Sequence, residues 1–319
     1  MKAIRIHELG AADKLTLEEI EQPAPKADEV LIKTAAAGVN YADIMMRAGN
    51  YLTKPDLPLT LGYEAAGTIA ETGADVRNLQ IGQRVLATVT SGGYAEYATA
   101  KAALTMPIPD ELGFGASTAL LVQGLTALGL LNETKSGQTI LIHAAAGGVG
   151  SLLVQLAKHK NLKVVGTSSN ERKLQKVAEL GADFAVNYTK DDWTDEILKA
   201  TKNRGADWII EMVGGDIVAQ NLKVLAKGGT MWIYGAASGA DYKVSVLSLM
   251  AKNHTIRGYW LMNESIENRI RFTKELLEHI RENRLKIEVT EFPLEHARAA
   301  HEAIESRETT GKVVLTVRQ

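Results

Sequence analysis

The chain has 319 residues, its 36 lysines and arginines nearly balance its 38 aspartates and glutamates, and it contains no cysteine. A chain of this length can form two domains of ordinary size. The formal net charge of −2 provides no basic surface for a nucleic acid. The lack of cysteine excludes disulfides, thiolate nucleophiles and cysteine-ligated metals. We expect no membrane-spanning segment and no signal peptide, and therefore a cytoplasmic protein.

Short β-rich runs, interrupted by glycine and proline, make up the first third of the chain. These runs lie at residues 2–7, 29–36, 67–72, 83–87 and 93–99. The pattern predicts a mostly antiparallel β domain.

Strands and helices alternate strictly along the middle of the chain. Strands are predicted at residues 139–142, 163–167, 184–187, 207–211, 230–234 and 254–258. Helices are predicted between them at residues 149–160, 171–180, 192–203, 215–226 and 245–252. Six strands separated by single helices predict a doubly wound parallel sheet with helices on both faces.

The chain from residue 260 onward starts with a charged amphipathic helix at 264–283 and ends in a strand at 312–317. The simplest architecture is a discontinuous, catalytic β-rich domain formed by residues 1–117 and 260–319. Residues 118–259 would form an inserted dinucleotide-binding domain. The ligand site would then lie between the domains, beside the carboxyl ends of the parallel strands.

A loop of small residues, His-Ala-Ala-Ala-Gly-Gly-Val-Gly at 143–150, joins the first parallel strand to the next helix. It resembles A-x-x-G-x-x-G on Ala144, Gly147 and Gly150 more than a strict G-x-G-x-x-G. Small residues let the backbone approach a pyrophosphate, and the N–H groups of the helix start bind its oxygens. The alternative is a glycine-rich turn that closes the helix on the sheet without any ligand.

The end of the second parallel strand indicates which nicotinamide cofactor would bind. NAD-preferring folds usually carry an acid there, whereas this chain has no carboxylate before Glu171. Room, positive charge and hydrogen-bond donors for a 2′-phosphate would come from Ser168, Ser169, Arg172, Lys173 and Tyr188. We therefore favour NADPH over NADH. The alternative is that the two serines cap a helix and the two cations are solvated surface charges.

Five segments together resemble one family over essentially the whole chain. They are Gly-Val-Asn-Tyr-Ala-Asp at 38–43, Arg-Ala-Gly-Asn-Tyr at 47–51, Pro-Leu-Thr-Leu-Gly-Tyr-Glu-Ala-Ala-Gly at 58–67, Gln-Gly-Leu-Thr-Ala at 123–127 and the loop at 144–150. Their order and spacing are similar to those of zinc-free medium-chain dehydrogenases/reductases of the quinone oxidoreductase and ζ-crystallin type. The resemblance implies a discontinuous GroES-like, mostly antiparallel β domain plus an inserted six-stranded doubly wound Rossmann sheet.

Two positions depart from the zinc-dependent branch of that family. Asn40 and Tyr63 stand where the zinc enzymes carry a cysteine and a histidine, and the four-cysteine zinc loop is missing. We therefore expect no metal and no Lewis-acid activation of an alcohol. The resemblance then implies hydride delivery from NADPH to an acceptor that is already electrophilic, namely a quinone or an α,β-unsaturated carbonyl.

The resemblance also assigns cofactor-binding residues. Lys173 and Tyr188, with Ser169, would hold the 2′-phosphate. The pyrophosphate, the nicotinamide with its ribose, and the floor of the site would be bound by Ala145, Gly147, Gly148, Val149, Asn40, Thr126, Val213 and Gly235.

Reduction of a carbonyl or quinone places negative charge on an oxygen, which needs a donor and then a proton. Tyr51 falls where related mitochondrial-type enoyl reductases place a tyrosine proton donor, and the amide of Asn40 is a second candidate. The alternative for Tyr51 is a role in the aromatic wall. Asp43 and Arg47 are four residues apart on a predicted helix and are interpreted as a structural ion pair.

The histidines form no metal-ligand set. His143, at the end of the first parallel strand, is interpreted as structural, and His296 and His301 as surface residues.

Three functions remain open at this point. We favour an NADPH-dependent quinone or enone reductase with a small-molecule substrate and no nucleic acid or membrane partner. An enoyl-thioester reductase acting on acyl-CoA or a carrier protein is the first alternative. A non-catalytic, crystallin-like NADPH-binding protein is the second. The resemblance implies a homodimer, joined through the strand at 230–234 at the edge of the nucleotide sheet.

Overall fold

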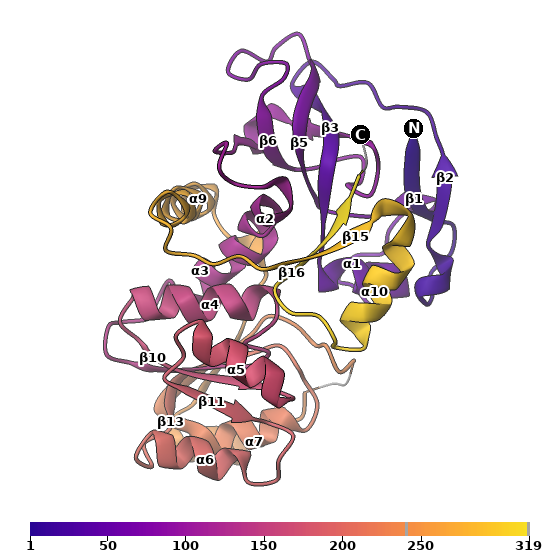
Figure 1. The fold of residues 1–319 in the computed structure, drawn as a ribbon. Coiled ribbons are helices and arrows are strands. Elements are labelled where there is room, and N and C mark those ends of the chain that lie inside the picture. Colours follow the sequence, from indigo (N-terminus) through magenta and orange to yellow (C-terminus); the bar gives the residue numbers. More distant parts are fainter. Residues whose placement is uncertain (240–241, 318–319) are drawn as a thin grey trace. The chain divides into compact units, whose positions relative to one another are not determined.

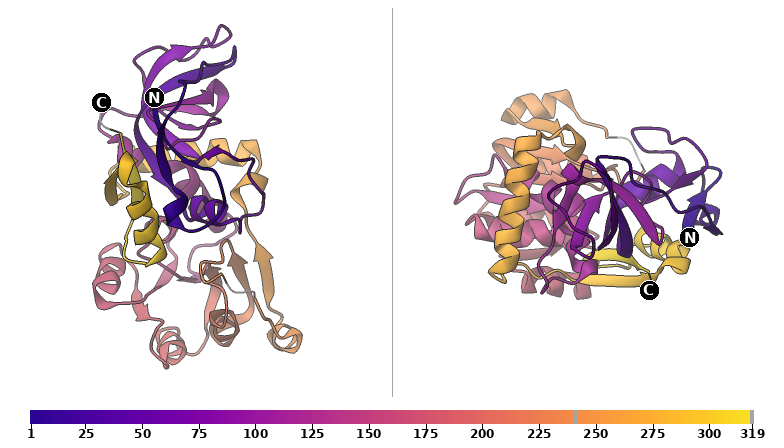
Figure 2. Two further views of the ribbon diagram at one scale, coloured as in Figure 1. Left: turned by 90° about the vertical axis from the view of Figure 1, so that its right-hand side faces the viewer. Right: turned by 90° about the horizontal axis from the view of Figure 1, so that it is seen from above.

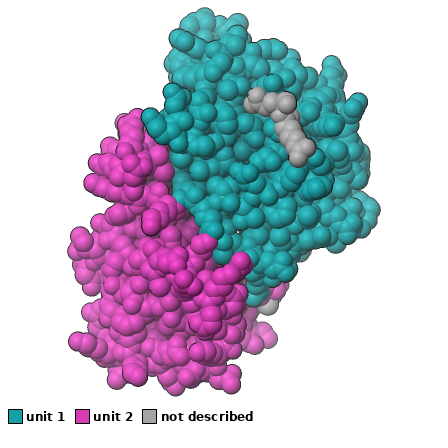
Figure 3. Space-filling model, in the orientation of Figure 1, with its two compact units in different colours: residues 1–122, 287–319 teal, residues 123–286 magenta. Residues whose placement is uncertain are grey.

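The computed structural model describes residues 1–239 and 242–317. Its internal contacts define two compact units, residues 1–122 with 287–319 and residues 123–286, which are coloured separately in Figure 3. The sequence-based boundaries at 117/118 and 259/260 differ from these. Residues 260–286 lie in the second unit because their helix packs on a helix of that unit, α9 on α3.

The first unit contains a seven-stranded sheet, with the order β15-β16-β3-β5-β6-β8 and β7 paired to β3, and a three-stranded sheet, β2-β1-β4. All pairs are antiparallel except β15 with β16, which confirms the predicted mostly antiparallel domain. The strands are β1 (Lys2–Ile6), β2 (Thr16–Glu19), β3 (Glu29–Val39), β4 (Leu59–Thr60), β5 (Glu64–Thr72), β6 (Arg84–Thr88), β7 (Tyr97–Lys101), β8 (Thr105–Pro107), β15 (Val289–Pro293) and β16 (Lys312–Thr316).

Helices pack against the seven-stranded sheet. Helix α10 packs on β16, as Figures 1 and 2 show from different sides. The helices of the first unit are η1 (Ala12–Lys14), α1 (Tyr41–Ala48), η2 (Ala102–Leu104), α2 (Phe114–Thr118), η5 (Leu294–His296) and α10 (Ala297–Glu305). The C-cap of helix α1 is Gly49, whose φ of 79° is the left-handed conformation that glycine adopts at little cost.

The long strand β3 is buried along most of its length, because helix α2 and strands on both sides cover it. Its register with β5 shifts between Thr34 and Ala36, opposite Gly67. A Cβ on Gly67 would lie 2.0 Å from the Lys33 carbonyl oxygen, so the backbones approach too closely for any side chain there.

The second unit is built on a six-stranded parallel sheet with the order β11-β10-β9-β12-β13-β14. The chain runs outward from β9 and then outward again from β12, which is the predicted doubly wound arrangement. The strands are β9 (Thr139–Ile142), β10 (Lys163–Ser168), β11 (Phe184–Asn187), β12 (Ala206–Glu211), β13 (Leu225–Ile233) and β14 (Thr255–Gly258).

Helices α4 and α5 lie on one face of this sheet, and α6 and α7 lie on the other (Figure 1). The helices of the unit are α3 (Thr126–Leu131), α4 (Gly148–His159), α5 (Glu171–Glu179), α6 (Trp193–Ala200), α7 (Ile217–Val224), α8 (Val246–Lys252), η4 (Leu261–Asn263) and α9 (Ile266–Arg281). A core that includes Leu141, Val165, Trp193, Ile209 and Leu222 fills the space between the sheet and α6 and α7.

The predicted strands and helices of the middle region are confirmed, and the largest difference is at β13. This strand begins at Leu225 rather than at residue 230, because the chain bulges at Gly228, whose φ is 73°, between two stretches that both pair with β12. Strand β13 is internal, between β12 and β14. The expectation that residues 230–234 form the sheet edge is therefore wrong, because the two edge strands among the described residues are β11 and β14.

One helical segment of the described chain, residues 114–131, is long and apolar enough to cross a membrane. The sequence-based expectation of no membrane-spanning segment did not take the length and composition of this segment into account. However, 72% of it is buried within the fold, as in the core helix of a globular protein. It comprises α2, the π-helical turn η3 (Leu120–Leu125) and α3.

Candidate functional site

The loop after β9 has the backbone geometry that the sequence predicts for a dinucleotide cradle. Helix α4 begins at Gly148, and Gly147 is its extended N-cap residue. A Cβ on Gly150 would lie 2.2 Å from the Ala144 carbonyl oxygen, so the loop can fold back on the helix only with glycine there. Ala144 itself has a φ of 49°, a conformation that non-glycine residues rarely adopt.

The predicted loop residues divide into two groups. Ala145 is fully buried, and its N–H donates to the carbonyl oxygen of Thr167 at 3.0 Å, so its role is to shape the loop. Gly147, Gly148 and Val149 are partly exposed at the start of α4. These three positions are the ones that can present backbone N–H groups to a phosphate.

Gln123 is a residue at this loop whose role sequence reasoning missed. A Cβ on Gly148 would lie 2.1 Å from the Gln123 amide nitrogen, so the side chain packs directly on the start of α4. The amide oxygen of Gln123 is buried and has no hydrogen-bond partner among the described residues. Thr126, three residues further along, is also buried. The N–H groups of the glycine cradle suit the pyrophosphate of a dinucleotide, and the unpaired amide oxygen beside them can accept a hydrogen bond from a ribose hydroxyl.

Two of the residues predicted to hold a 2′-phosphate are hydrogen-bonded at the end of β10, and a third lies on the first turn of the next helix. Ser168 is the last residue of β10, and its carbonyl oxygen accepts a hydrogen bond from the N–H of Tyr188 at 3.2 Å. Lys173 lies on the first turn of α5 and is largely buried. Arg172 is exposed and Ser169 is partly exposed.

The cap of α5 is Asn170, whose side chain accepts a hydrogen bond from the N–H of Lys173 at 3.0 Å. The alternative that Ser168 and Ser169 cap this helix is therefore wrong. Both serines remain candidates for the phosphate site.

The floor predicted for the cofactor site lies at the ends of β12 and β13. The N–H groups of Val213 and Gly214 both donate to the carboxylate of Glu211. The Gly235 carbonyl oxygen accepts a hydrogen bond from the Tyr242 hydroxyl. His143 is fully buried, and both of its ring nitrogens have hydrogen-bond partners, which agrees with its structural interpretation.

In the first unit, Asn40 caps α1 within a buried ion-pair network. Its amide Nδ2 donates to Glu64 Oε1 at 2.9 Å, and its Oδ1 accepts from Lys312 Nζ at 3.0 Å. Glu64 and Lys312 are fully buried and paired with each other. A Cβ on Gly38 would lie 2.2 Å from Glu64 Oε1, so this glycine makes room for the carboxylate. The network leaves Asn40 with one N–H for any further contact.

Tyr51, the predicted proton donor, lies beside a second tyrosine in the same unit. The ring centroids of Tyr51 and Tyr63 are 6.4 Å apart with the planes tilted by 54°. Burial, followed by the nearby Tyr51, raises the pKa of Tyr63 far above its ordinary value, so Tyr63 stays protonated.

The ion pair predicted between Asp43 and Arg47 does not form. Arg47 donates to Glu305 instead, with Nη2 2.6 Å from Oε1, and to His301 Nδ1 at 3.2 Å. Asp43 Oδ2 accepts from the Asn40 N–H and the Tyr94 hydroxyl. Arg47 therefore pairs with α10, and Asp43 binds Tyr94 and the N-cap of its own helix, although the spacing of the two residues along the helix would permit contact.

His301 is fully buried, so the expectation of a surface residue is wrong, whereas His296 is exposed as expected. Because Arg47 donates to His301 Nδ1, the neutral ring carries its proton on Nε2, which lies 3.1 Å from the Tyr94 hydroxyl oxygen. A continuous hydrogen-bonded chain thus runs from Arg47 through His301 and Tyr94 to Asp43.

Burial is the main cause of the pKa shifts of His301 and Asp43 in this row of hydrogen-bonded residues. It lowers the pKa of His301 to about 3, with the Arg47 cation acting in the same direction. It raises the pKa of Asp43 to about 7, against the opposing hydrogen bond from the Asn40 backbone. His301 is thus neutral at pH 7, and Asp43 is poised between its two protonation states.

Among residues 1–239 and 242–317, no three histidine, aspartate or glutamate side chains gather in an arrangement that would hold a metal ion. The positions that carry zinc ligands in the zinc-dependent branch are used otherwise here. Asn40 belongs to the ion-pair network, and the Tyr63 hydroxyl contacts the sulfur of Met46 at 3.9 Å.

Comparison with known proteins places the chain in a family. A family model described as "Alcohol dehydrogenase GroES-like domain" matches residues 26–110, and one described as "Zinc-binding dehydrogenase" matches residues 148–277. A "Probable quinone oxidoreductase" of Schizosaccharomyces pombe is 35% identical and covers 98% of this chain and 96% of its own length.

Two solved structures are similar over the whole chain. The quinone oxidoreductase of Escherichia coli complexed with NADPH is 30% identical, with a TM-score of 0.94, and covers 99% of this chain and 100% of its own. The CurK enoyl reductase is 25% identical, with a TM-score of 0.89, and covers 99% of each chain. The chain belongs to the quinone oxidoreductase family of the medium-chain dehydrogenases and reductases, which confirms the resemblance seen in its motifs.

The opposing pKa shifts of His301 and Asp43 make stability depend on pH. The unfolded chain binds a proton at His301 below pH 6.5, whereas the folded chain does so only near pH 3. The free energy of unfolding therefore falls as the pH falls from 6.5 towards 3. Asp43 acts in the opposite sense, because its raised pKa weakens the folded state as the pH rises towards 7.

A His301→Gln variant isolates the histidine contribution, because glutamine can accept from Arg47 and donate to Tyr94 without titrating. We expect the variant to be less stable than the original chain at pH 7.5. The difference should narrow by up to about 1.4 kcal/mol per pH unit below pH 6.5 in urea unfolding. The exposed His296→Gln is the matched control and should show no such trend. Parallel pH profiles for His301→Gln and the original chain would contradict the assignment.

Proposed function

We propose that the protein reduces quinones or α,β-unsaturated carbonyls with NADPH, by hydride transfer without zinc. The observation that carries this proposal is the set of residues at the carboxyl ends of the parallel strands in the second unit. There, the glycine cradle at Gly150 lies beside a strand end without a carboxylate. Tyr188 is hydrogen-bonded to Ser168 at this strand end, and Lys173 lies on the first turn of the helix that follows it. The names of the relatives and the NADPH complex of the Escherichia coli protein support the same activity.

Each group of residues has one task in this proposal. NADPH, when bound, supplies the hydride. The N–H groups at the start of α4 bind the pyrophosphate, and Gln123 and Thr126 contact the adjoining ribose. Lys173 and Tyr188, with Ser168, Ser169 and Arg172 around them, bind the 2′-phosphate. Val213 and Gly235 form the floor of the site.

The first unit supplies the acid chemistry. The Tyr51 hydroxyl donates a proton to the substrate oxygen on which negative charge develops. The remaining N–H of Asn40 offers a hydrogen bond to the same oxygen, and the Glu64–Lys312 pair keeps its amide in one orientation.

An enoyl-thioester reductase is the second candidate, and the structural similarity to the CurK enoyl reductase favours it. Steady-state assays with 1,4-benzoquinone, 9,10-phenanthrenequinone, 1-octen-3-one and crotonyl-CoA separate the two. Turnover of crotonyl-CoA alone would replace the quinone assignment by the thioester one. NADPH binding without oxidation by any acceptor would support a non-catalytic protein.

The role of Lys173 predicts a cofactor-specific effect. Lys173→Ala removes one cation from the 2′-phosphate site, so the KM for NADPH should rise by roughly tenfold while the KM for NADH changes little. Both constants are measured with a quinone acceptor at saturation. Lys199→Ala, at an exposed position of α6, is the matched control. An equal rise for both cofactors in Lys173→Ala would refute this role.

The role of Tyr51 predicts an effect on turnover. Tyr51→Phe keeps the ring but removes the hydroxyl, so kcat with an enone should fall by about 100-fold, within the range expected for general acid catalysis. The KM for NADPH should stay unchanged. Tyr97→Phe on β7 serves as the control. An unaltered kcat would return Tyr51 to the wall of the site.

We further infer that two copies associate through the edge strand β14. Among the residues that the structure describes, no strand pairs with its outer side. The adjacent helix α8 exposes three large apolar side chains, with Val246, Leu247 and Met250 each more than 60% exposed. An isologous contact would join the two sheets and cover these side chains.

This dimer predicts that charge on α8 causes dissociation. In a Leu247→Glu, Met250→Glu variant, each new carboxylate would be buried against the copy related by the two-fold axis. Sedimentation velocity should give a dimer for the original chain and a monomer for the variant. Leu17→Glu, at an exposed position of β2, is the control. A monomeric original chain would contradict the inference.

A further inference from the structure

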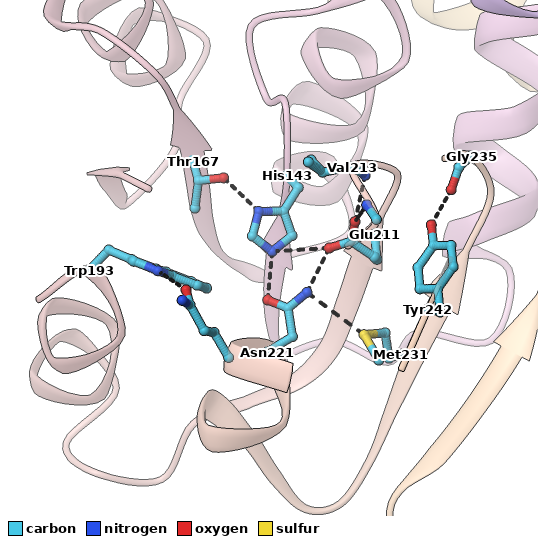
Figure 4. A network of polar contacts seen from close by, with 11 residues as sticks. His143, Thr167, Trp193, Glu211, Val213, Asn221, Met231, Gly235 and Tyr242 are labelled. Atoms are coloured by element: carbon cyan, nitrogen blue, oxygen red, sulfur yellow. Dashed lines mark hydrogen bonds and ion pairs between the residues drawn. The ribbon is translucent and has the colours of Figure 1, made fainter. Parts of the chain in front are cut away.

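A buried chain of hydrogen bonds joins the carboxyl ends of three neighbouring parallel strands in the second unit (Figure 4). Thr167 lies near the end of β10, His143 follows β9, and Glu211 ends β12. Asn221, on α7, connects His143 to Glu211. All four side chains are fully buried, so any hydrogen bond that one of them loses cannot be replaced by water.

The donors and acceptors allow one consistent order. Glu211 Oε2 accepts from Asn221 Nδ2 at 2.6 Å. The Asn221 Oδ1 must then accept from His143 Nε2, 2.8 Å away, which places the proton of the neutral imidazole on Nε2. His143 Nδ1 is left to accept from the Thr167 hydroxyl at 2.9 Å.

The other carboxylate oxygen of Glu211 holds a turn of the backbone. Oε1 accepts from the N–H of Val213 at 2.5 Å and from the N–H of Gly214 at 2.9 Å. Gly214 has a φ of 83°, so the turn has a conformation that few sequences adopt without such support. Glu211 therefore satisfies two backbone donors that would otherwise be left in a largely buried place.

Each end of this chain supports a segment that the proposed function assigns to the cofactor. Val213 belongs to the turn that Glu211 holds. The Thr167 carbonyl oxygen accepts from Ala145 in the glycine loop, and Ser168 follows Thr167 directly. His143 is the residue immediately before that loop. A shift of any one member would displace parts of the binding edge relative to the others.

We propose that Glu211 and Asn221 are positioning residues for NADPH, which fix the relative placement of the glycine loop, the end of β10 and the 213–214 turn. This assignment rests on the proposed function. It follows from the direction of the hydrogen bonds, because the order requires an acceptor-only group at position 211 and an amide at position 221.

Exchanging the two functional groups tests the assignment. Glu211→Gln alone sets the new N–H groups against those of Asn221, and Asn221→Asp alone sets two carboxylates together. In the double variant, the new glutamine can still accept from the 213–214 turn and can donate to the new aspartate, which also accepts from His143. The single variants should raise the Kd for NADPH about tenfold or more, and the double variant should return it to within about threefold of the original value.

A purely structural role would give a different result. NADPH binding is followed by nucleotide fluorescence, Tm by differential scanning calorimetry, and kcat with a quinone at saturating NADPH. The single variants should change Kd and KM for NADPH far more than kcat. Gln220→Ala is the matched control, because Gln220 directly precedes Asn221 on α7 and accepts a hydrogen bond from Trp193. It should lower Tm and leave the Kd for NADPH unchanged.

If Glu211→Gln fails to fold, Thr167→Val tests the other end of the same row of hydrogen bonds in a protein that keeps the Glu211 carboxylate. Its Kd for NADPH should rise about threefold or more. Two results would overturn the positioning role and leave the proposed function standing. They are unchanged NADPH affinity in the folded variants, and a double variant that regains Tm without regaining affinity. If the original chain does not bind NADPH, both the proposed function and this assignment fail.

Discussion

A charged carboxylate that is removed from water is costly unless several hydrogen bonds satisfy it, and each unit of this protein contains a buried carboxylate that is satisfied in this way. In the first unit, Glu64 accepts from Asn40 and Lys312 through one oxygen and from the Val122 N–H through the other. In the second, Glu211 accepts from two backbone N–H groups and from Asn221. Both carboxylates therefore bind the backbone and thereby hold local chain geometry in place.

This arrangement connects packing with chemistry. Replacing either carboxylate would leave several buried donors without acceptors, so the segments that carry them would have to move. In the first unit those segments carry Asn40 at the start of α1, and in the second they carry the turn at Val213. The same interactions that stabilise the fold thus determine where the proposed substrate and cofactor contacts lie, and such preorganisation is what makes polar groups effective in catalysis.

The local patterns predicted the secondary structure of the second unit well, because strict alternation of buried strands with amphipathic helices leaves few other topologies. They also predicted the glycine loop and the strand end beside Ser168. They failed where the partner of a side chain comes from a distant part of the chain. Arg47 pairs with Glu305 and not with Asp43, and His301 is buried beside Arg47, because these residues of α1 and α10 are far apart in sequence and meet only in the folded domain.

The sequence alone determined the family, the order of strands and helices, and the small-residue segments through which a dinucleotide could approach the backbone, because these depend on local periodicity and on the absence of side chains. The tertiary structure alone decided that β14, and not β13, is an edge strand, that Asn40 is held by Glu64 and Lys312, and that Glu211 supports the turn at Val213. Hydrogen-bond direction and burial depend on groups that are far apart in sequence, so no spacing of residues along the chain could have revealed them.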